Sequence, residues 1–163
     1  MSNPNLLAGT QRTIPGTPAA DTIVFTAEHT TVNAGEGANT ITGTSGHNLI
    51  NSGAGVDTIA VTSGDNTIQA GAGANTITAT TGDNAITTGD GADTITVTSG
   101  DNTILAGDGA NTIVATSGVN TITTGSGADT ITTGGVAGGG NTINAGDGAN
   151  TVTTGAGDDT VTG

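Results

Sequence analysis

Asparagine and aspartate recur at every eighteenth position along most of this chain. Amide and carboxylate oxygens accept hydrogen bonds, and they are also the ligand type that hard cations take. One series alternates the two residue types: Asn39, Asp57, Asn75, Asp93, Asn111 and Asp129, then Asn150 after a short insertion. A second series contains only asparagine: Asn48, Asn66, Asn84, Asn102, Asn120 and Asn141. If the members of a series stack on one another, the second series predicts a ladder of side-chain amides that hydrogen-bond to one another.

The alternating series admits two interpretations. Its oxygens hold cations, or the alternation simply keeps carboxylates two layers apart, roughly 10 Å, so that repulsion is relieved without a metal. A third series, one place before the asparagine series, reads His29, His47, Asp65, Asp83 and Asp101. These are turn positions, so the side chains either point into water or hold cations, with the two histidines as additional metal ligands.

Other chemistry is excluded by what the sequence lacks. The net charge is −13, with one Lys or Arg in total, so nucleic acid and anionic membranes are not expected as direct partners. There is no Cys, which excludes disulfides, zinc–thiolate sites and thiol nucleophiles. No G-x-S-x-G, H-E-x-x-H or phosphate loop with Lys occurs, and an enzyme is not expected. Residues 1–20 have neither the charge nor the apolar run of a Sec signal peptide.

A nine-residue repeat must position the polar series. Large aliphatic residues stand nine apart from Ile23 to Ile131, and the series resumes at Ile143, Val152 and Val161 after a short insertion. The unit reads G-x-(N/D)-T-I, in two versions that alternate, so the structural period is two units.

Each unit combines turn residues with a short β-branched run, which is too short for a strand and a helix. Two units form one coil. The sequence therefore predicts an all-β parallel β-roll or β-solenoid of about 18 residues per coil and about eight coils, roughly 40 Å long at about 4.8 Å per coil. The aliphatic residues should point inward. We expect an N-terminal arm over residues 1–20 and the solenoid over residues 21–163.

The units resemble the repeat-in-toxin (RTX) nonapeptide G-G-x-G-x-D-x-U-x, a calcium-binding parallel β-roll. Gly107, Gly109, Asn111 and Ile113 fall on the second Gly, third Gly, Asp and large aliphatic of that pattern. The resemblance covers residues 21–163 and implies extracellular calcium and type 1 export. It places Ca²⁺ between successive coils near Asp57, Asp93 and Asp129. Each site would then receive one carboxylate and one amide oxygen, the latter from Asn75 or Asn111, so binding should be weak.

One face of the predicted rod is rich in threonine. Outward positions of alternate units form a flat grid without charges, which includes Thr76, Thr78, Thr80, Thr94, Thr96 and Thr98. The grid resembles the Thr-x-Thr arrays of ice-binding β-solenoids and also suits packing between rods. Threonine is also favoured in any solvated sheet, which is the simplest explanation.

The last unit is an ordinary repeat, and exposed strand edges are templates for pairing. Apolar residues available for contact near the ends are Leu6, Leu7, Ile14, Phe25 and Val161. We therefore expect a secreted structural subunit that associates with copies of itself, head to tail, into an extracellular filament. The alternatives are an ice-binding protein and a calcium-responsive RTX module of a larger exported protein.

Overall fold

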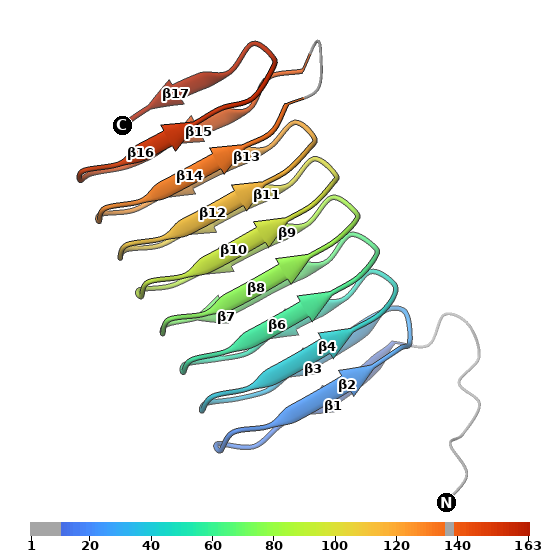
Figure 1. Ribbon diagram of the computed structural model, residues 1–163. Helices are drawn as coiled ribbons and strands as arrows, with labels where there is room; N and C mark the ends of the chain where they lie inside the picture. Colours follow the sequence, from blue (N-terminus) through green and yellow to red (C-terminus); the bar gives the residue numbers. More distant parts are fainter. Residues whose placement is uncertain (1–10, 136–138) are drawn as a thin grey trace, which may run out of the picture.

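The computed structural model describes residues 11–135 and 139–163 and shows a parallel β-solenoid of about eight turns (Figure 1). Its strands are β1 (Arg12–Pro15), β2 (Thr22–Phe25), β3 (Thr30–Asn33), β4 (Thr40–Gly43), β5 (Leu49–Asn51), β6 (Thr58–Val61), β7 (Thr67–Gly71), β8 (Thr76–Ala79), β9 (Ala85–Thr88), β10 (Thr94–Val97), β11 (Thr103–Ala106), β12 (Thr112–Ala115), β13 (Thr121–Thr124), β14 (Thr130–Thr133), β15 (Thr142–Asn144), β16 (Thr151–Thr153) and β17 (Thr160–Thr162).

Odd-numbered strands form one nine-stranded sheet and even-numbered strands form an eight-stranded sheet. Every pairing is parallel, and each strand pairs with the strand one coil away, so Ile95 of β10 faces Ile77 of β8 and Ile113 of β12. One coil holds ~18 residues, which confirms the predicted period. The coil that contains the insertion is longer, and there Ile122 of β13 faces Ile143 of β15.

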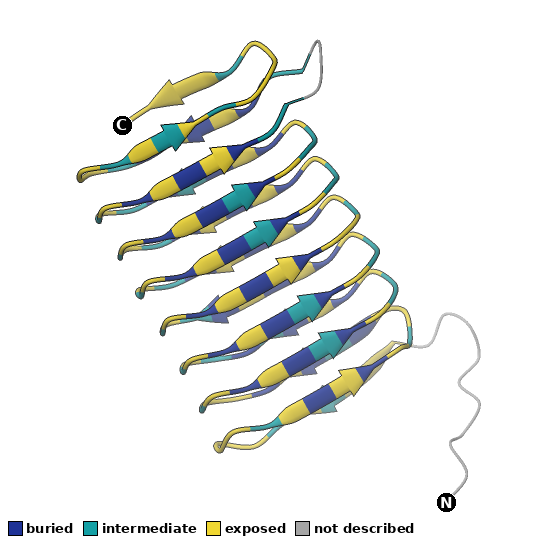
Figure 2. Cartoon of the chain, in the orientation of Figure 1, coloured by how far each residue is buried: buried dark blue, intermediate teal, exposed yellow. Residues whose placement is uncertain are grey.

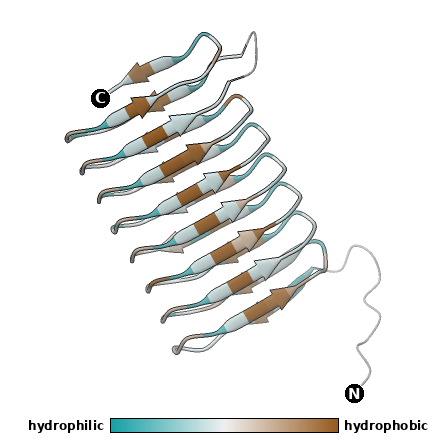
Figure 3. Ribbon diagram, in the orientation of Figure 1, coloured by the Kyte–Doolittle hydropathy of each residue, from teal (hydrophilic) through white to brown (hydrophobic). Residues whose placement is uncertain are grey.

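The core consists of two facing ladders of large aliphatic side chains, one from each sheet. Burial alternates along the strands, as in the exposed–buried–exposed–buried pattern of β8 and β11 (Figure 2). The aliphatic positions appear as a hydrophobic stripe across the sheet (Figure 3). All of them from Ile23 to Ile143 are buried, while Val152 is only partly buried. Val161 differs from the prediction because it is 48% exposed, although it pairs in register with Ile143.

A second inward column holds small side chains, such as Ala79 and Ala115, which lets the two sheets approach closely. Phe25 is the largest residue in this column and is 2% exposed. Its ring occupies the space next to Gly43, where a β-carbon would collide with it.

Glycine is required where the turns stack. Gly73 has a φ of +127°, and a β-carbon there would meet the carbonyl oxygen of Gly55 in the preceding coil. The same relationship links Gly91 to Gly73 and Gly109 to Gly91. The Gly-x-Gly turns are therefore a requirement of coil stacking, because any larger residue would push neighbouring coils apart.

The first strand lies earlier than the predicted domain boundary at residue 21. β1 pairs in parallel with β3, and Ile14 packs against the core. Ile14 and Phe25, which we had considered as contacts between copies, thus contact this chain's own core. Leu6 and Leu7 lie outside the described residues.

Candidate functional site

The alternating column lies inside the roll, immediately before the strands of the eight-stranded sheet. Asp57 precedes β6, Asp93 precedes β10 and Asp129 precedes β14. The three aspartates are at most 1% exposed, as are Asn75 and Asn111 between them. Carboxylates are almost never buried to this extent unless they are paired or bound to a metal.

One oxygen of each side chain in this column joins neighbouring coils. Oδ1 of Asp93 accepts the backbone N–H of Asn75 at 2.8 Å, and Oδ1 of Asn75 accepts the backbone N–H of Asp57 at 3.0 Å. The pattern continues with Oδ1 of Asn111 on the backbone N–H of Asp93 at 3.0 Å. The amide oxygens that we had expected to face a cation are therefore engaged with the backbone.

The asparagines also satisfy their second polar atom within their own turn. Nδ2 of Asn75 donates to the carbonyl oxygens of Gly71 at 3.2 Å and Gly73 at 2.9 Å. Nδ2 of Asn111 donates in the same way to Gly107 at 3.0 Å and Gly109 at 3.2 Å. Each amide thus closes its Gly-x-Gly turn from the inside.

The aspartates lack this closure. Oδ2 of Asp57, Asp93 and Asp129 is buried and has no hydrogen-bond partner among the described residues. Asp93 holds the place of Asn75 one coil later, and its turn carries Gly89 and Gly91 where the Asn75 turn carries Gly71 and Gly73. A carboxylate oxygen cannot donate to the glycine carbonyls as the asparagine Nδ2 does, so these three turns lack the closure that the asparagine turns have.

A hard divalent cation fits this donor set. Ca²⁺ takes carboxylate and backbone carbonyl oxygens together, and its charge compensates a buried carboxylate. The ligands on offer at each turn are Oδ2 of one aspartate and the carbonyl oxygens of its glycines, supplemented by water.

The other edge of the roll is closed by side-chain amides from Asn48 to Asn141. Nδ2 of Asn84 donates to Oδ1 of Asn102 at 3.1 Å and to the Gly82 carbonyl at 2.8 Å, while Oδ1 of Asn102 also accepts the backbone N–H of Asn84 at 3.0 Å. This confirms the predicted asparagine ladder. All six of its members are at most 4% exposed: Asn48, Asn66, Asn84, Asn102, Asn120 and Asn141.

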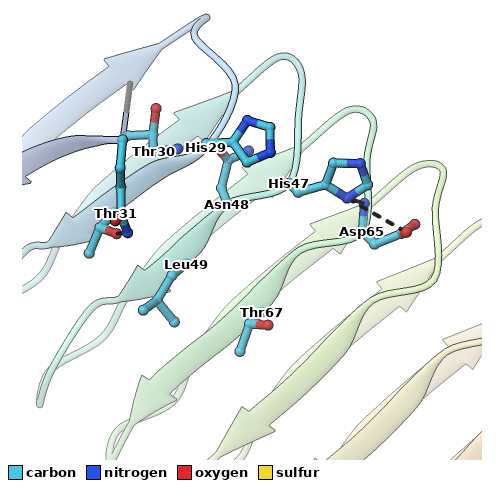
Figure 4. A pocket seen from close by; sticks show the side chains of 9 residues that line it. His29, Thr30, Thr31, His47, Asn48, Leu49, Asp65 and Thr67 are labelled. Carbon is cyan, nitrogen blue, oxygen red and sulfur yellow. Dashed lines mark hydrogen bonds and ion pairs between the residues drawn. The ribbon is translucent and has the colours of Figure 1, made fainter. Parts of the chain in front are cut away.

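The turn column of His29, His47, Asp65, Asp83 and Asp101 is exposed on the surface. Figure 4 shows its first three members, His29, His47 and Asp65, on successive turns. Oδ1 of Asp65 accepts the backbone N–H of Asp83 at 2.7 Å, and Oδ1 of Asp83 accepts that of Asp101 at 2.7 Å. Nδ1 of His47 likewise accepts a hydrogen bond from the backbone N–H of Asp65 at 3.2 Å. In residues 11–135 and 139–163, no group of three or more His, Asp or Glu is arranged to hold a metal. The hydrogen bonds of this column link successive coils, and Asp65, Asp83 and Asp101 are themselves exposed.

Sequence reasoning missed Asp159, which continues the asparagine ladder after Asn141. Oδ1 of Asp159 accepts both the backbone N–H of Asn141 at 2.7 Å and its Nδ2 at 2.9 Å. These hydrogen bonds, the backbone one foremost, hold the pKa of Asp159 below its ordinary value. Its position one full coil after Asn141 was a sufficient signal. Asp108 has a lowered pKa for a similar reason, since its Oδ1 accepts the Ser126 backbone N–H at 2.7 Å.

Comparison with protein families identifies the class. The model of the RTX calcium-binding nonapeptide repeat matches residues 27–59, 61–95, 87–121, 105–135 and 136–163. The chain therefore belongs to the RTX calcium-binding repeat family, as its repeat unit indicated. No curated protein and no solved structure matches it. The described residues contain no helix long and apolar enough to cross a membrane.

Proposed function

We propose that this chain is a calcium-binding β-roll module of an exported protein, with Ca²⁺ held at the turns of Asp57, Asp93 and Asp129. The observation that carries the proposal is the buried, partnerless Oδ2 of each of these aspartates. RTX repeats bind Ca²⁺, and proteins that contain them are typically exported. We place the module outside the cell and assign it no catalytic role.

Calcium would act as a structural ligand. With the ion bound, each buried carboxylate has a counter-charge and the inner carbonyls of its turn have a partner, so the coil is stabilised. Because one carboxylate oxygen serves each site, the affinity should be no tighter than the high-micromolar range of extracellular sites, about 10⁻⁴–10⁻³ M.

Isothermal calorimetry on the full chain after EDTA treatment tests this proposal, together with thermal unfolding followed by circular dichroism. Added Ca²⁺ should raise the melting temperature, since a ligand that binds only the folded state stabilises it. Replacing all three aspartates (Asp57→Asn, Asp93→Asn, Asp129→Asn) should abolish the heat of binding. Unchanged binding in that variant would refute the assignment.

Self-association is a second proposed function, in which copies of the chain stack head to tail into an extracellular filament. Val161 favours it, because it continues the core ladder in register with Ile143 yet is 48% exposed. β17 is also the last strand in the order of its sheet and pairs with β15 alone among the described strands. A second copy stacked on this end would cover Val161 and extend the ladder.

The threonine grid remains a third proposal, ice binding. Thr76, Thr78 and Thr80 are exposed along β8 and its flank, and Thr94 and Thr98 repeat the pattern one coil away. Parallel register places these hydroxyls in rows, about 4.8 Å apart between strands and about 7 Å apart along a strand.

A further inference from the structure

We infer that asparagine amides take the place of calcium in this roll, so that the turns of Asp57, Asp93 and Asp129 take up the ion and the asparagine turns are closed by the protein itself. For the aspartate turns the inference rests on the calcium binding proposed above. For the asparagine turns it rests on hydrogen bonds alone.

The alternating column provides the direct comparison, because Asn75 and Asp93 occupy the same place in successive coils. Both use Oδ1 to accept a backbone N–H from the preceding coil. They differ at the second polar atom, where Nδ2 of Asn75 donates to Gly71 and Gly73 and Oδ2 of Asp93 has no partner. The amide N–H groups thus supply the partial positive charge that the aspartate turn would receive from a bound cation.

The asparagine ladder extends the same replacement to the whole opposite edge. Nδ2 of Asn48 contacts the carbonyl oxygens of Ser45 and Gly46 at 3.0 Å each, and it also donates to Oδ1 of Asn66 in the next coil at 2.9 Å. One amide therefore joins the carbonyls of its turn to an oxygen of the neighbouring coil, which is what an ion between coils would do. No member of this ladder from Asn48 to Asn141 carries a negative charge that needs compensation.

Two consequences separate this roll from one that has an ion at every turn. The chain should bind three calcium ions, all on the edge that carries Asp57, Asp93 and Asp129. It should also keep its β structure without calcium, because the amide turns on both edges hold the coils together.

Exchanging aspartate and asparagine within the alternating column tests this inference. Asp93→Asn should raise the melting temperature in EDTA and reduce the calcium stoichiometry from three to two, since the new amide closes the turn at Gly89 and Gly91. Asn75→Asp should lower the melting temperature in EDTA and raise the stoichiometry to four, with Ca²⁺ restoring the loss. If Asn75→Asp is unfolded in EDTA, refolding by Ca²⁺ gives the same answer.

Matched controls exist in the same turns. Asp90→Asn removes a charge from the exposed middle of the Gly89–Gly91 turn, and Ala72→Asp adds one at the equivalent place between Gly71 and Gly73. Neither should change the calcium stoichiometry, and both should shift the melting temperature in EDTA much less than the buried exchanges.

The outcomes distinguish the two proposals. If the unmodified chain binds no calcium but Asp93→Asn still raises and Asn75→Asp still lowers the melting temperature in EDTA, the calcium proposal fails and the amide closure stands. If Asp93→Asn lowers that temperature, or Asn75→Asp leaves it unchanged, the inference is wrong. An unfolded unmodified chain in EDTA also overturns it.

Discussion

The backbone N–H of Asn75 donates to Oδ1 of Asp93 at 2.8 Å, although both residues are almost completely buried. The bond joins two coils through Oδ1 and leaves Oδ2 of the same carboxylate buried. A repeating backbone contact thereby leaves a buried carboxylate oxygen without a hydrogen-bond partner among the described residues. In the calcium site proposed above, Oδ1 therefore has the structural role and Oδ2 is the oxygen left for the cation.

Stacking of the glycine turns predicts the effect of Gly73→Ala. The added methyl group would collide with the Gly55 carbonyl oxygen at a φ of +127° that alanine rarely adopts. We expect a loss of about 2–4 kcal/mol in the free energy of unfolding. Urea denaturation measures it, with Ala72→Ser at the exposed middle of the same turn as the control. A loss below about 0.5 kcal/mol, as for an ordinary surface substitution, would show that the coils can shift to admit the methyl group.

The lowered pKa of Asp159 predicts how stability depends on pH at the end of the asparagine ladder. A carboxyl whose pKa is lower in the folded state stabilises the fold above its unfolded pKa of about 3.9, and the stabilisation is lost as pH falls through the folded pKa. Melting temperatures between pH 6 and pH 2 should therefore fall less steeply in Asp159→Asn, where an amide oxygen keeps accepting both hydrogen bonds without titrating. Asp158→Asn removes the same charge next to it and serves as the control. Identical pH profiles for Asp159→Asn and the unmodified chain would contradict the prediction.

Head-to-tail association predicts that Val161→Asp weakens assembly. A charge at this exposed end of the core ladder would be buried in the junction between copies, whereas salt or Ca²⁺ should promote assembly by screening the net charge of −13. Sedimentation velocity at several salt concentrations measures the assembly state. Val56→Asp adds the same charge at a turn residue that is 59% exposed in the middle of the roll. A monomer at high concentration in all salt and Ca²⁺ conditions would end the filament proposal.

The threonine grid predicts that Thr78→Lys abolishes thermal hysteresis, because a long charged side chain would prevent a flat contact with ice. The circular dichroism spectrum should not change, since Thr78 is exposed. Thr87→Lys places the same residue on the exposed face of β9 in the other sheet and should retain hysteresis. If the unmodified protein shows no hysteresis, ice binding is excluded.

The fold could be predicted from the sequence because the repeat determines it locally. A large aliphatic residue every nine positions, preceded by glycine and by asparagine or aspartate, allows one register only, since a shift by a single residue would turn Ile95 and its equivalents outward. The same spacing correctly predicted the ladder from Asn48 to Asn141, because stacked identical amides can satisfy one another. Asp159 lies 18 residues after Asn141, so the same spacing could also have predicted that it accepts hydrogen bonds from Asn141.

The tertiary structure decided what the spacing leaves open. Sequence alone treated the two oxygens of Asp93 as equivalent and counted the Asn75 oxygen as a cation ligand, whereas backbone N–H groups of neighbouring coils occupy one oxygen of each residue. The sequence placed Asp57 in the alternating column and Asp65 in a turn column that could face water, but it could not show that the roll encloses Asp57 completely. One is enclosed by the roll and lacks a partner for Oδ2, while the other reaches into water, and that difference in burial depends on which way the backbone turns in three dimensions.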